Sequence, residues 1–173
     1  MTTRFLIAVL SFVIAAPAYA GSKTAIFPFI LVTPVQEEDF FLGTKKTSPE
    51  EEARLKLVHQ EFTKLVTANG TYDAVDLAPL AAEIEAKMPI NECNGCEIDL
   101  AKKSGADTAF IIVVEKASNT VLNLSVSELD VEKQGIKRNV MAVIQGNTDD
   151  AWLGGVRWIV KNRILMPQKA SAP

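Results

Sequence analysis

Residues 108–114, with the sequence Thr-Ala-Phe-Ile-Ile-Val-Val, form the most apolar run of the chain after its first 20 residues. Seven such residues between turn signals are typical of a β-strand that is buried on both of its faces. A strand of this kind belongs in the middle of a sheet, so we expect residues 108–114 to be the central strand of the fold.

The residues that follow this run predict a hairpin and then a helix. Strands are expected at 121–131 and 137–146, and the first of them alternates apolar and polar side chains, which predicts one dry face and one wet face. Residues 147–150 are expected to cap a final helix at 151–165. This helix contains Gly154 and Gly155, each of which costs about 1 kcal/mol relative to alanine. We therefore expect the helix to pack closely on the sheet or on a partner.

The residues before the central strand alternate between strands and helices. Residues 23–32 predict a strand in which Pro28 cannot donate a hydrogen bond, which favours an edge position or a bulge. Ser48 and Glu51 have the spacing of a capping box at the start of a helix. A short strand and two short helices follow, and the complete order is β-α-β-α-α-β-β-β-α. This order predicts an α/β (α+β) fold, with a single mixed β-sheet of about five strands and helices packed against it.

The first 20 residues have the three parts of a signal peptide. Arg4 supplies a positive charge, residues 5–16 are an apolar stretch, and Ala18-Tyr19-Ala20 is a cleavage signal. The 12 residues of the apolar stretch are fewer than the roughly 20 that a membrane-spanning helix needs. We therefore expect cleavage after Ala20, a periplasmic location, no integral membrane segment, a single domain at 21–166 and a flexible tail at 167–173.

Composition and charge narrow the class of partner. The chain has 173 residues, of which 48% are hydrophobic and 23% are charged, as in an ordinary globular protein. Removing Arg4 from the 18 basic residues leaves 17 against 21 acidic residues, which is a net charge of −4. Because phosphate binding needs clustered Lys and Arg, and no basic cluster is present, a nucleic-acid partner is not expected.

Cys93 and Cys96 form the most distinctive motif, Cys-Asn-Gly-Cys. Two thiols at this spacing can form a disulfide, bind a metal or take part in redox exchange. A structural disulfide fits an oxidising compartment, whereas redox exchange is favoured by the following helix, whose amino terminus would stabilise a thiolate. A zinc site would lack ligands, because His59 is distant in the sequence. We expect a structural disulfide, with redox exchange as the alternative.

Other side chains give fewer signs of chemistry. No Ser or Cys has a His and an Asp in a context for nucleophilic catalysis, so no catalytic residue, metal site or cofactor is expected. Asp149 and Asp150 are expected to cap the last helix. The acidic stretch 37–39 is interpreted as a solvated loop or, alternatively, a cation site. The aromatic residues least explained by the predicted core are either core residues or anchors of a partner-binding surface: Phe40, Phe41 and Trp158.

Several local patterns resemble known families of exported proteins. Residues 25–29 read Ala-Ile-Phe-Pro-Phe, residues 70–76 read Gly-Thr-Tyr-Asp-Ala-Val-Asp, and a helix ends in Gly-Ala-Asp at 105–107. These patterns resemble the amino-terminal domain of the Tol translocation protein and the curli-secretion lipoprotein family. With the two cysteines and residues 146–152, the chain is also similar to an uncharacterised family of exported proteobacterial proteins of unknown function. The resemblance spans about residues 24–165 and implies this fold and a periplasmic setting, without a catalytic residue.

We therefore predict a non-catalytic binding or accessory protein, not an enzyme. It would act by protein–protein interaction in the periplasm or cell envelope, or with an exported enzyme system. Two alternatives are a thiol-disulfide protein that uses Cys93 and Cys96, and a small-molecule or metal-binding protein that uses the loop at 37–41. The sequence carries no signal for an oligomeric state.

Overall fold

The computed structural model describes residues 21–33, 47–118 and 120–166. The predicted signal peptide, the stretch 37–41 with Phe40 and Phe41, and the tail at 167–173 lie outside the described residues. No helix among the described residues is long and apolar enough to cross a membrane. In chain order the elements are β1 (Ser22–Ile26), β2 (Ile30–Val32), α2 (Pro49–Thr67), β3 (Tyr72–Ala74), α3 (Ala81–Ala86), α4 (Cys96–Lys103), β4 (Thr108–Lys116), β5 (Val121–Asp130), β6 (Gly135–Gln145) and α5 (Asp149–Ile159), which continues as a π-helix over Val160–Ile164.

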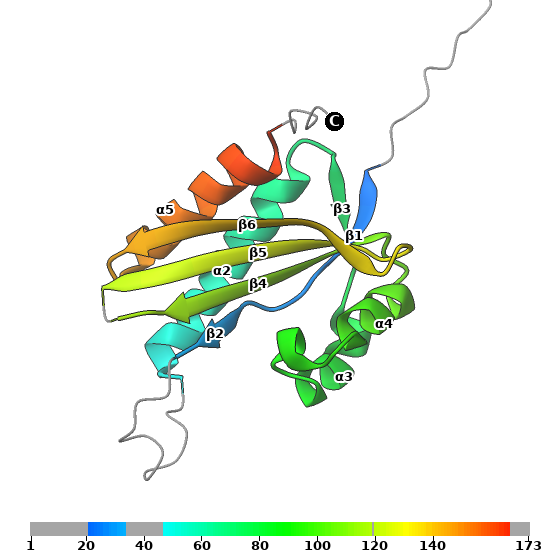
Figure 1. Cartoon of the computed structure of the whole chain (residues 1–173), viewed down its shortest axis with the longest axis horizontal. Coiled ribbons are helices and arrows are strands. Elements are labelled where there is room, and N and C mark those ends of the chain that lie inside the picture. The colour runs from blue at the N-terminus through cyan, green and yellow to red at the C-terminus, as the bar shows by residue number, and fades with distance from the viewer. Residues whose placement is uncertain (1–20, 34–46, 119, 167–173) are drawn as a thin grey trace, which may run out of the picture.

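One mixed sheet holds the six described strands (Figure 1). Its order is β3-β1-β4-β5-β6, and β2 pairs with β4 further along the same side as β1. The β1–β3, β1–β4 and β2–β4 pairs are parallel, whereas the β4–β5 and β5–β6 pairs are antiparallel. The predicted mixed sheet with helices packed against it is therefore confirmed, and so is the predicted hairpin.

The strand predicted at 23–32 is divided at Pro28. Phe27 still donates its backbone N–H to the carbonyl of Phe110 at 3.1 Å, but Pro28 has no N–H, and the chain rejoins the sheet only at Ile30. This division explains why the sheet has six strands and not about five. Of the two positions considered for Pro28, the edge is wrong for β1, which lies between β3 and β4.

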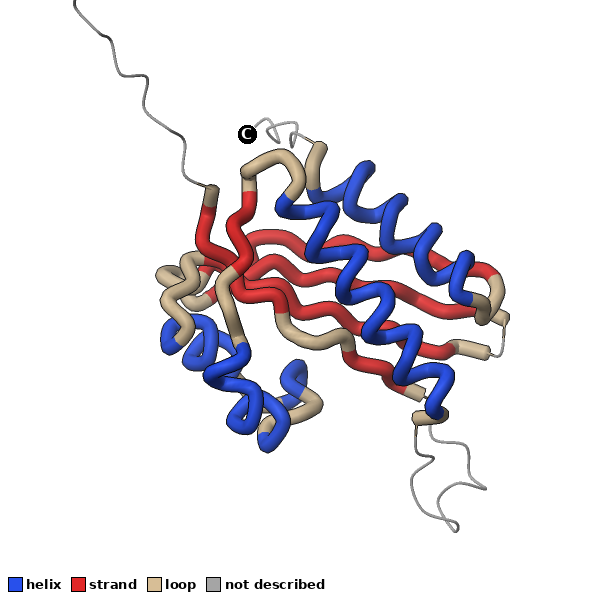
Figure 2. The backbone as a smooth tube through the Cα atoms, turned by 180° about the vertical axis from the view of Figure 1, so that it is seen from behind, coloured by secondary structure: helices blue, strands red, loops and turns tan. Residues whose placement is uncertain are grey.

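β4 is the central strand, as predicted, and is packed on both faces. On one face Phe110, Ile112 and Val114 join side chains of α2 and α5 in one core. On the other face Ala109 and Ile111 join side chains of α3 and α4 in a second core. α2 and α5 run side by side across the first face (Figure 2), whereas α3 and α4 cover only the β1 end of the second face (Figure 1).

The starts of two helices follow from local sequence. Oγ of Ser48 accepts the N–H of Glu51 at 3.2 Å, and the Glu51 carboxylate accepts the N–H of Ser48 at 3.1 Å, so the predicted capping box is confirmed. At α5 the N-cap is Thr148, whose Oγ1 accepts the N–H of Ala151 at 3.3 Å. Asp149 and Asp150 occupy the first turn, where a negative charge is favoured by the helix dipole.

α5 approaches β6 closely at one glycine. A Cβ atom on Gly155 would lie 2.5 Å from Cγ1 of Ile144, whereas a Cβ atom on Gly154 would have no atom within 4 Å. Close packing of the helix on the sheet is therefore confirmed at Gly155. Gly154 does not contact the sheet, and packing on a partner there stays a prediction.

Candidate interaction surface

Residues 121–127 of β5 and 139–145 of β6 have no helix on one of their faces, which we call the open face (Figure 1), whereas Leu129 near the end of β5 packs with α4 in the second core. Side chains alternate along both strands, so that those directed toward α2 and α5 are largely buried and those on the open face are half-buried or exposed. The predicted division of the hairpin into a dry and a wet face is therefore confirmed. Eight side chains make up the open face: Val121, Asn123, Ser125 and Ser127 of β5, and Asn139, Met141, Val143 and Gln145 of β6.

The open face combines hydrogen-bonding groups with exposed apolar side chains. Asn139 donates from Nδ2 to Oγ of Ser127 at 2.8 Å. Met141 is 59% exposed and Val143 is 65% exposed. None of the eight side chains carries a charge. Mixed polar and apolar groups without charge are typical of the central part of a protein–protein interface.

A bulge at the start of β6 redirects two basic side chains. The register pairs Glu128 with Arg138 and Leu129 with Ile136, so Lys137 is an extra residue on β6. A bulge of this kind changes the direction of neighbouring side chains, and here both basic residues reach the carboxylate of Glu128. Lys137 donates from Nζ to Oε1 at 2.7 Å, and Arg138 donates from Nε to Oε2 at 2.9 Å.

Glu128 is the centre of a buried network that connects β3, β5, β6 and the end of the last helix. Its side chain is 1% exposed, and Tyr72 donates from its hydroxyl to Oε1 at 3.1 Å. Arg138 also donates to the carbonyl oxygens of Arg163 and Ile164, at 2.8 and 2.9 Å. The network therefore holds the start of β6, and with it the open face, against β3 and the last helix.

The protonation states of the network follow from its own contacts. Burial by itself would raise the pKa of Glu128, but the hydrogen bonds and charges of Lys137 and Arg138 lower it below the ordinary value of 4.5. Burial raises the pKa of Tyr72 to about 12, and the Glu128 charge adds to this effect. Glu128 is therefore a carboxylate and Tyr72 a neutral phenol at neutral pH. Because protein donors already occupy both carboxylate oxygens, the network has a structural role.

The sequence contains a signal for this network that was not part of the prediction. Leu122, Leu124 and Val126 mark the buried face of β5, and Glu128 continues the same alternation. A charge at such a position needs a buried partner. No local pattern identifies Arg138 as that partner, because its direction depends on the bulge.

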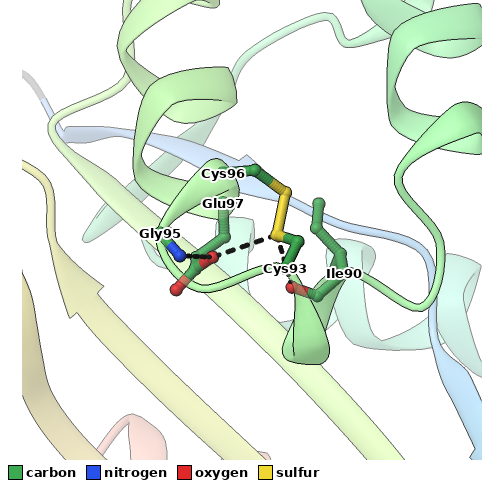
Figure 3. Close-up of a disulfide and its surroundings, with 5 residues drawn as sticks. All are labelled: Ile90, Cys93, Gly95, Cys96 and Glu97. Carbon is green, nitrogen blue, oxygen red and sulfur yellow. Dashed lines mark hydrogen bonds between the residues drawn. A yellow bond between two sulfur atoms is a disulfide. The ribbon is translucent and has the colours of Figure 1, made fainter.

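Cys93 and Cys96 are joined by a disulfide at the start of α4 (Figure 3). Their Cα atoms are 5.6 Å apart, and Gly95 between them has a φ of +106°, a conformation that favours glycine. The sulfur of Cys93 lies 3.0 Å from the carbonyl oxygen of Ile90 and 3.3 Å from a carboxylate oxygen of Glu97. In a reduced form these two oxygens would accept a thiol proton and disfavour a thiolate. The surroundings of Cys93 thus favour a structural disulfide over redox exchange.

The same turn holds the one group of possible metal ligands found in the described ranges. Cys93, Cys96 and Glu97 place their ligand atoms within 4.8 Å of one another. The two sulfurs are bonded to each other, so this set of three ligands would exist only after reduction. His59 is not a member of the group.

His59 lies in a groove between α2 and the segment that separates β1 from β2. The groove has a volume of about 470 Å³, and its apolar lining includes Pro28, Phe29 and Leu55. Nδ1 of His59 is buried without a hydrogen-bond partner in the described part of the chain, and burial lowers the pKa of His59. Phe29 packs edge-on against the imidazole, with ring centroids 6.1 Å apart. Glu52, Lys56 and Gln60 also line the groove. The edge-on packing against Phe29 fits a packing role for the imidazole.

Of the three aromatic residues predicted either as core or as partner-binding, the structure describes only Trp158. Its side chain is 46% exposed, and the guanidinium of Arg163 lies over the ring, 5.3 Å from its centroid. Trp158 is carried by α5, which covers the face opposite to the open face. The structure therefore does not place Trp158 beside Met141 and Val143, and Phe40 and Phe41 lie outside the described residues.

Comparison with protein families identifies the group to which the chain is related. Residues 23–164 match the family model described as "Protein of unknown function (DUF2380)". The chain belongs to this family. The predicted membership of an uncharacterised family is confirmed, over nearly the same residues as the predicted resemblance. No curated protein matches this DUF2380 chain.

Several solved structures resemble the DUF2380 chain. The lipoprotein GNA1162 from Neisseria meningitidis has a TM-score of 0.52 and 15% identity, over 83% of this chain and 96% of that chain. The C-terminal domain of LpoB from Salmonella enterica has a TM-score of 0.45 and 17% identity, over 76% of this chain and 87% of that chain. TolB from Acinetobacter baumannii has a TM-score of 0.41 and 11% identity, over 82% of this chain and 28% of TolB. The likeness to GNA1162 shows a shared fold.

Proposed function

We propose that this chain is an exported, non-catalytic binding protein of the cell envelope whose open face attaches to a protein partner. The observation that carries the proposal is the contrast between the two faces of β5 and β6. One face is covered by α2 and α5, whereas the open face exposes three apolar side chains, Val121, Met141 and Val143, and no charge. Burial of Met141 and Val143 against a partner would remove apolar surface from water and stabilise the complex.

The other candidate sites among the described residues support binding and not catalysis. Glu128, Arg138 and Tyr72 are occupied by one another. The two sulfurs are bonded together, and the buried Nδ1 of His59 has no hydrogen-bond partner within the described ranges. The carboxylate, guanidinium, phenol and sulfur groups of these sites are therefore occupied by contacts within the chain, and His59 is the one of these groups that lines a groove.

The envelope setting is supported by two further observations. Residues 1–20 have the pattern of a signal peptide, and GNA1162, which shares the fold, is a lipoprotein. A thiol-disulfide protein is the second candidate function. The position of Cys96 at the first residue of α4 favours it, and the Glu97 carboxylate beside the Cys93 sulfur opposes it.

Site-specific photo-cross-linking in intact cells tests the open face. A photoreactive amino acid is placed at Met141 or Val143, and a control is placed at Lys64, an exposed residue of α2 on the covered side of the sheet. We expect the two open-face positions to give the same cross-linked protein, and the Lys64 control to give none. Equal products from Lys64, or no product from either open-face position, would contradict the proposal.

A charge substitution provides the complementary test. Met141→Asp with Val143→Asp places two carboxylates on the open face, where they cannot be buried against a partner without cost. Both positions are exposed, so the melting temperature should change little while the partner is lost. If the charged variant keeps the partner, the binding surface lies elsewhere.

A further inference from the structure

The disulfide has two oxygen atoms beside one of its sulfurs, at distances that suit the ligands of a small cation. The sulfur of Cys93 lies 3.0 Å from the carbonyl oxygen of Ile90 and 3.3 Å from Oε2 of Glu97 (Figure 3). In a tetrahedral zinc site, with bonds of about 2.3 Å to sulfur and about 2.0–2.2 Å to oxygen, neighbouring sulfur and oxygen ligands lie about 3.5 Å apart. The turn therefore places oxygen close to where a zinc ion on the Cys93 sulfur would need it.

The backbone of the turn holds the Glu97 carboxylate in this place. Cys96 and Glu97 are the first two residues of α4, and Gly95 donates its N–H to Oε2 of Glu97 at 3.0 Å. Two cysteines separated by two residues also have the spacing with which many structural zinc sites present a pair of thiolates. Glu97, and not His59, thus supplies the further ligand that the cysteine pair needs.

The same oxygens oppose a free thiolate but attract a cation. A thiolate at Cys93 would face the Glu97 carboxylate and the Ile90 carbonyl oxygen, which are both negative. A divalent cation among the three is attracted by each of them, and the amino terminus of α4 favours the thiolates that the cation requires. The reduced turn is therefore more stable with a cation bound than as a free thiolate.

The turn is accessible from solvent. Cys93 and Glu97 are half-buried, and Cys96 is 8% exposed, so a reductant and an ion can reach the Cys93 sulfur. The disulfide joins residues only three positions apart, and the entropic stabilisation from so short a loop is small. Both properties favour reduction of the pair within the folded domain.

We infer that the Cys93–Cys96 turn is a redox-controlled metal site, closed as a disulfide and open after reduction to a zinc-like divalent cation held by Cys93, Cys96 and Glu97. A dithiol reductant gives up two electrons and two protons and becomes a disulfide, while the bond between the two sulfurs breaks and two thiols form. The cation then replaces both thiol protons, which pass to solvent. The Ile90 carbonyl or a water fills the fourth position. This inference concerns the turn alone and does not rest on the proposed function of the open face.

Zinc titration of the exported protein tests the site. One sample is kept oxidised, and another is reduced with a phosphine that is then removed. Competition with a chromophoric chelator measures binding of Zn²⁺ to each sample. We expect one Zn²⁺ per reduced chain at micromolar concentrations and none per oxidised chain or per chain of the variant with both Cys93→Ser and Cys96→Ser. Equal binding by the oxidised sample or by the serine variant, or no binding by the reduced sample, would overturn the inference.

Two substitutions near the start of α4 distinguish a ligand from a nearby charge. Glu97→Gln keeps an acceptor for the Gly95 N–H and removes the carboxylate, whereas Asp99→Asn removes an exposed carboxylate that is not in the ligand group. Glu97→Gln should raise the Kd for Zn²⁺ at least about tenfold, since even indirect partners of metal ligands contribute factors of about 10 to 100. Asp99→Asn should change the Kd less than about twofold, because water and salt screen an exposed charge. Equal effects of the two substitutions would overturn the three-ligand site.

The reduction potential of the cysteine pair gives an independent measurement. An ion that binds only the reduced form stabilises that form and raises the potential. At a Zn²⁺ concentration a hundred times the Kd, the equilibrium shifts by a factor of about 100, which is about 60 mV for this two-electron couple. A potential that Zn²⁺ leaves unchanged would overturn the inference, whereas photo-cross-linking of a partner to the open face would be unaffected.

Discussion

The substitution Glu128→Gln tests the most deeply buried charge of the fold. It keeps the size of the side chain and removes the negative charge that faces Arg138. The side chain of Arg138 is 11% exposed, and that of Glu128 is 1% exposed, so the remaining guanidinium would be buried without a counter-charge. Breaking a buried pair by removal of one partner costs about 3–5 kcal/mol. Because the amide can still accept one hydrogen bond, we expect the lower value, about 3 kcal/mol.

Lys137→Met is the matched control for this prediction. Lys137 binds the same carboxylate, but its side chain is 55% exposed, and an ion pair with such access to water contributes about 1 kcal/mol or less. Urea unfolding measures both variants, with fluorescence of the buried Trp152 as the signal. The reasoning is refuted if Glu128→Gln costs less than about 1 kcal/mol, or if Lys137→Met costs as much as Glu128→Gln.

Comparison of the original protein with Glu128→Gln also gives a pH test, and the lowered pKa of Glu128 fixes the direction in which their stability difference changes. The pKa of Glu128 is lowered in the folded protein relative to the ordinary 4.5. A carboxyl group with a lowered folded-state pKa contributes stability above its unfolded-state pKa, and this contribution is lost as pH falls through the lower folded-state value. The difference in unfolding free energy between the original protein and Glu128→Gln should therefore be largest above pH 4.5 and shrink in more acidic solution. A difference that grows with acidification would contradict this assignment.

Three further predictions concern packing, the disulfide and export. Gly155→Ala should destabilise the protein by about 1–3 kcal/mol, because the added methyl group meets Ile144. Gly154→Ala should stabilise it by up to about 1 kcal/mol, because alanine favours the helix and no atom lies within 4 Å. Equal melting temperatures for the two variants would contradict this prediction. Replacement of Cys93 and Cys96 by Ser should lower the free energy of unfolding by about 2 kcal/mol or less and leave partner binding intact. If the unsubstituted protein turns over a model disulfide at oxidoreductase rates, the redox alternative is favoured. The intact mass of the exported protein should correspond to a chain that begins at Gly21, and a species that keeps Met1 or carries a lipid would disprove the predicted processing.

The parts of the fold that could be predicted from sequence are those that depend on neighbouring residues. The continuous apolar run at residues 108–114 identifies a strand buried on both faces, because a strand with one solvent-exposed face would alternate apolar and polar side chains. The capping box at Ser48 and Glu51 marks the start of α2, since its two hydrogen bonds join residues only three positions apart. The alternation along β5 separates the open face from the covered face for the same reason. Cys93 and Cys96 are close enough in the chain to be recognised as a candidate disulfide without any knowledge of the fold.

What only the tertiary structure decided is which distant segments meet. Pro28 was recognised as an interruption, but its place between two strands on the same side of β4 depends on pairing with residues more than 80 positions away. Glu128 could be identified as a charge on an apolar face, yet its contact with Tyr72 spans 56 positions, and the contact of Arg138 with Ile164 spans 26. The open face of β5 and β6 likewise exists because α3 and α4 pack near β1 and leave most of these two strands without a helix. Periodicity and caps are local properties of a chain, whereas strand order, bulge position and the exposure of an edge result from packing of the whole sequence at once.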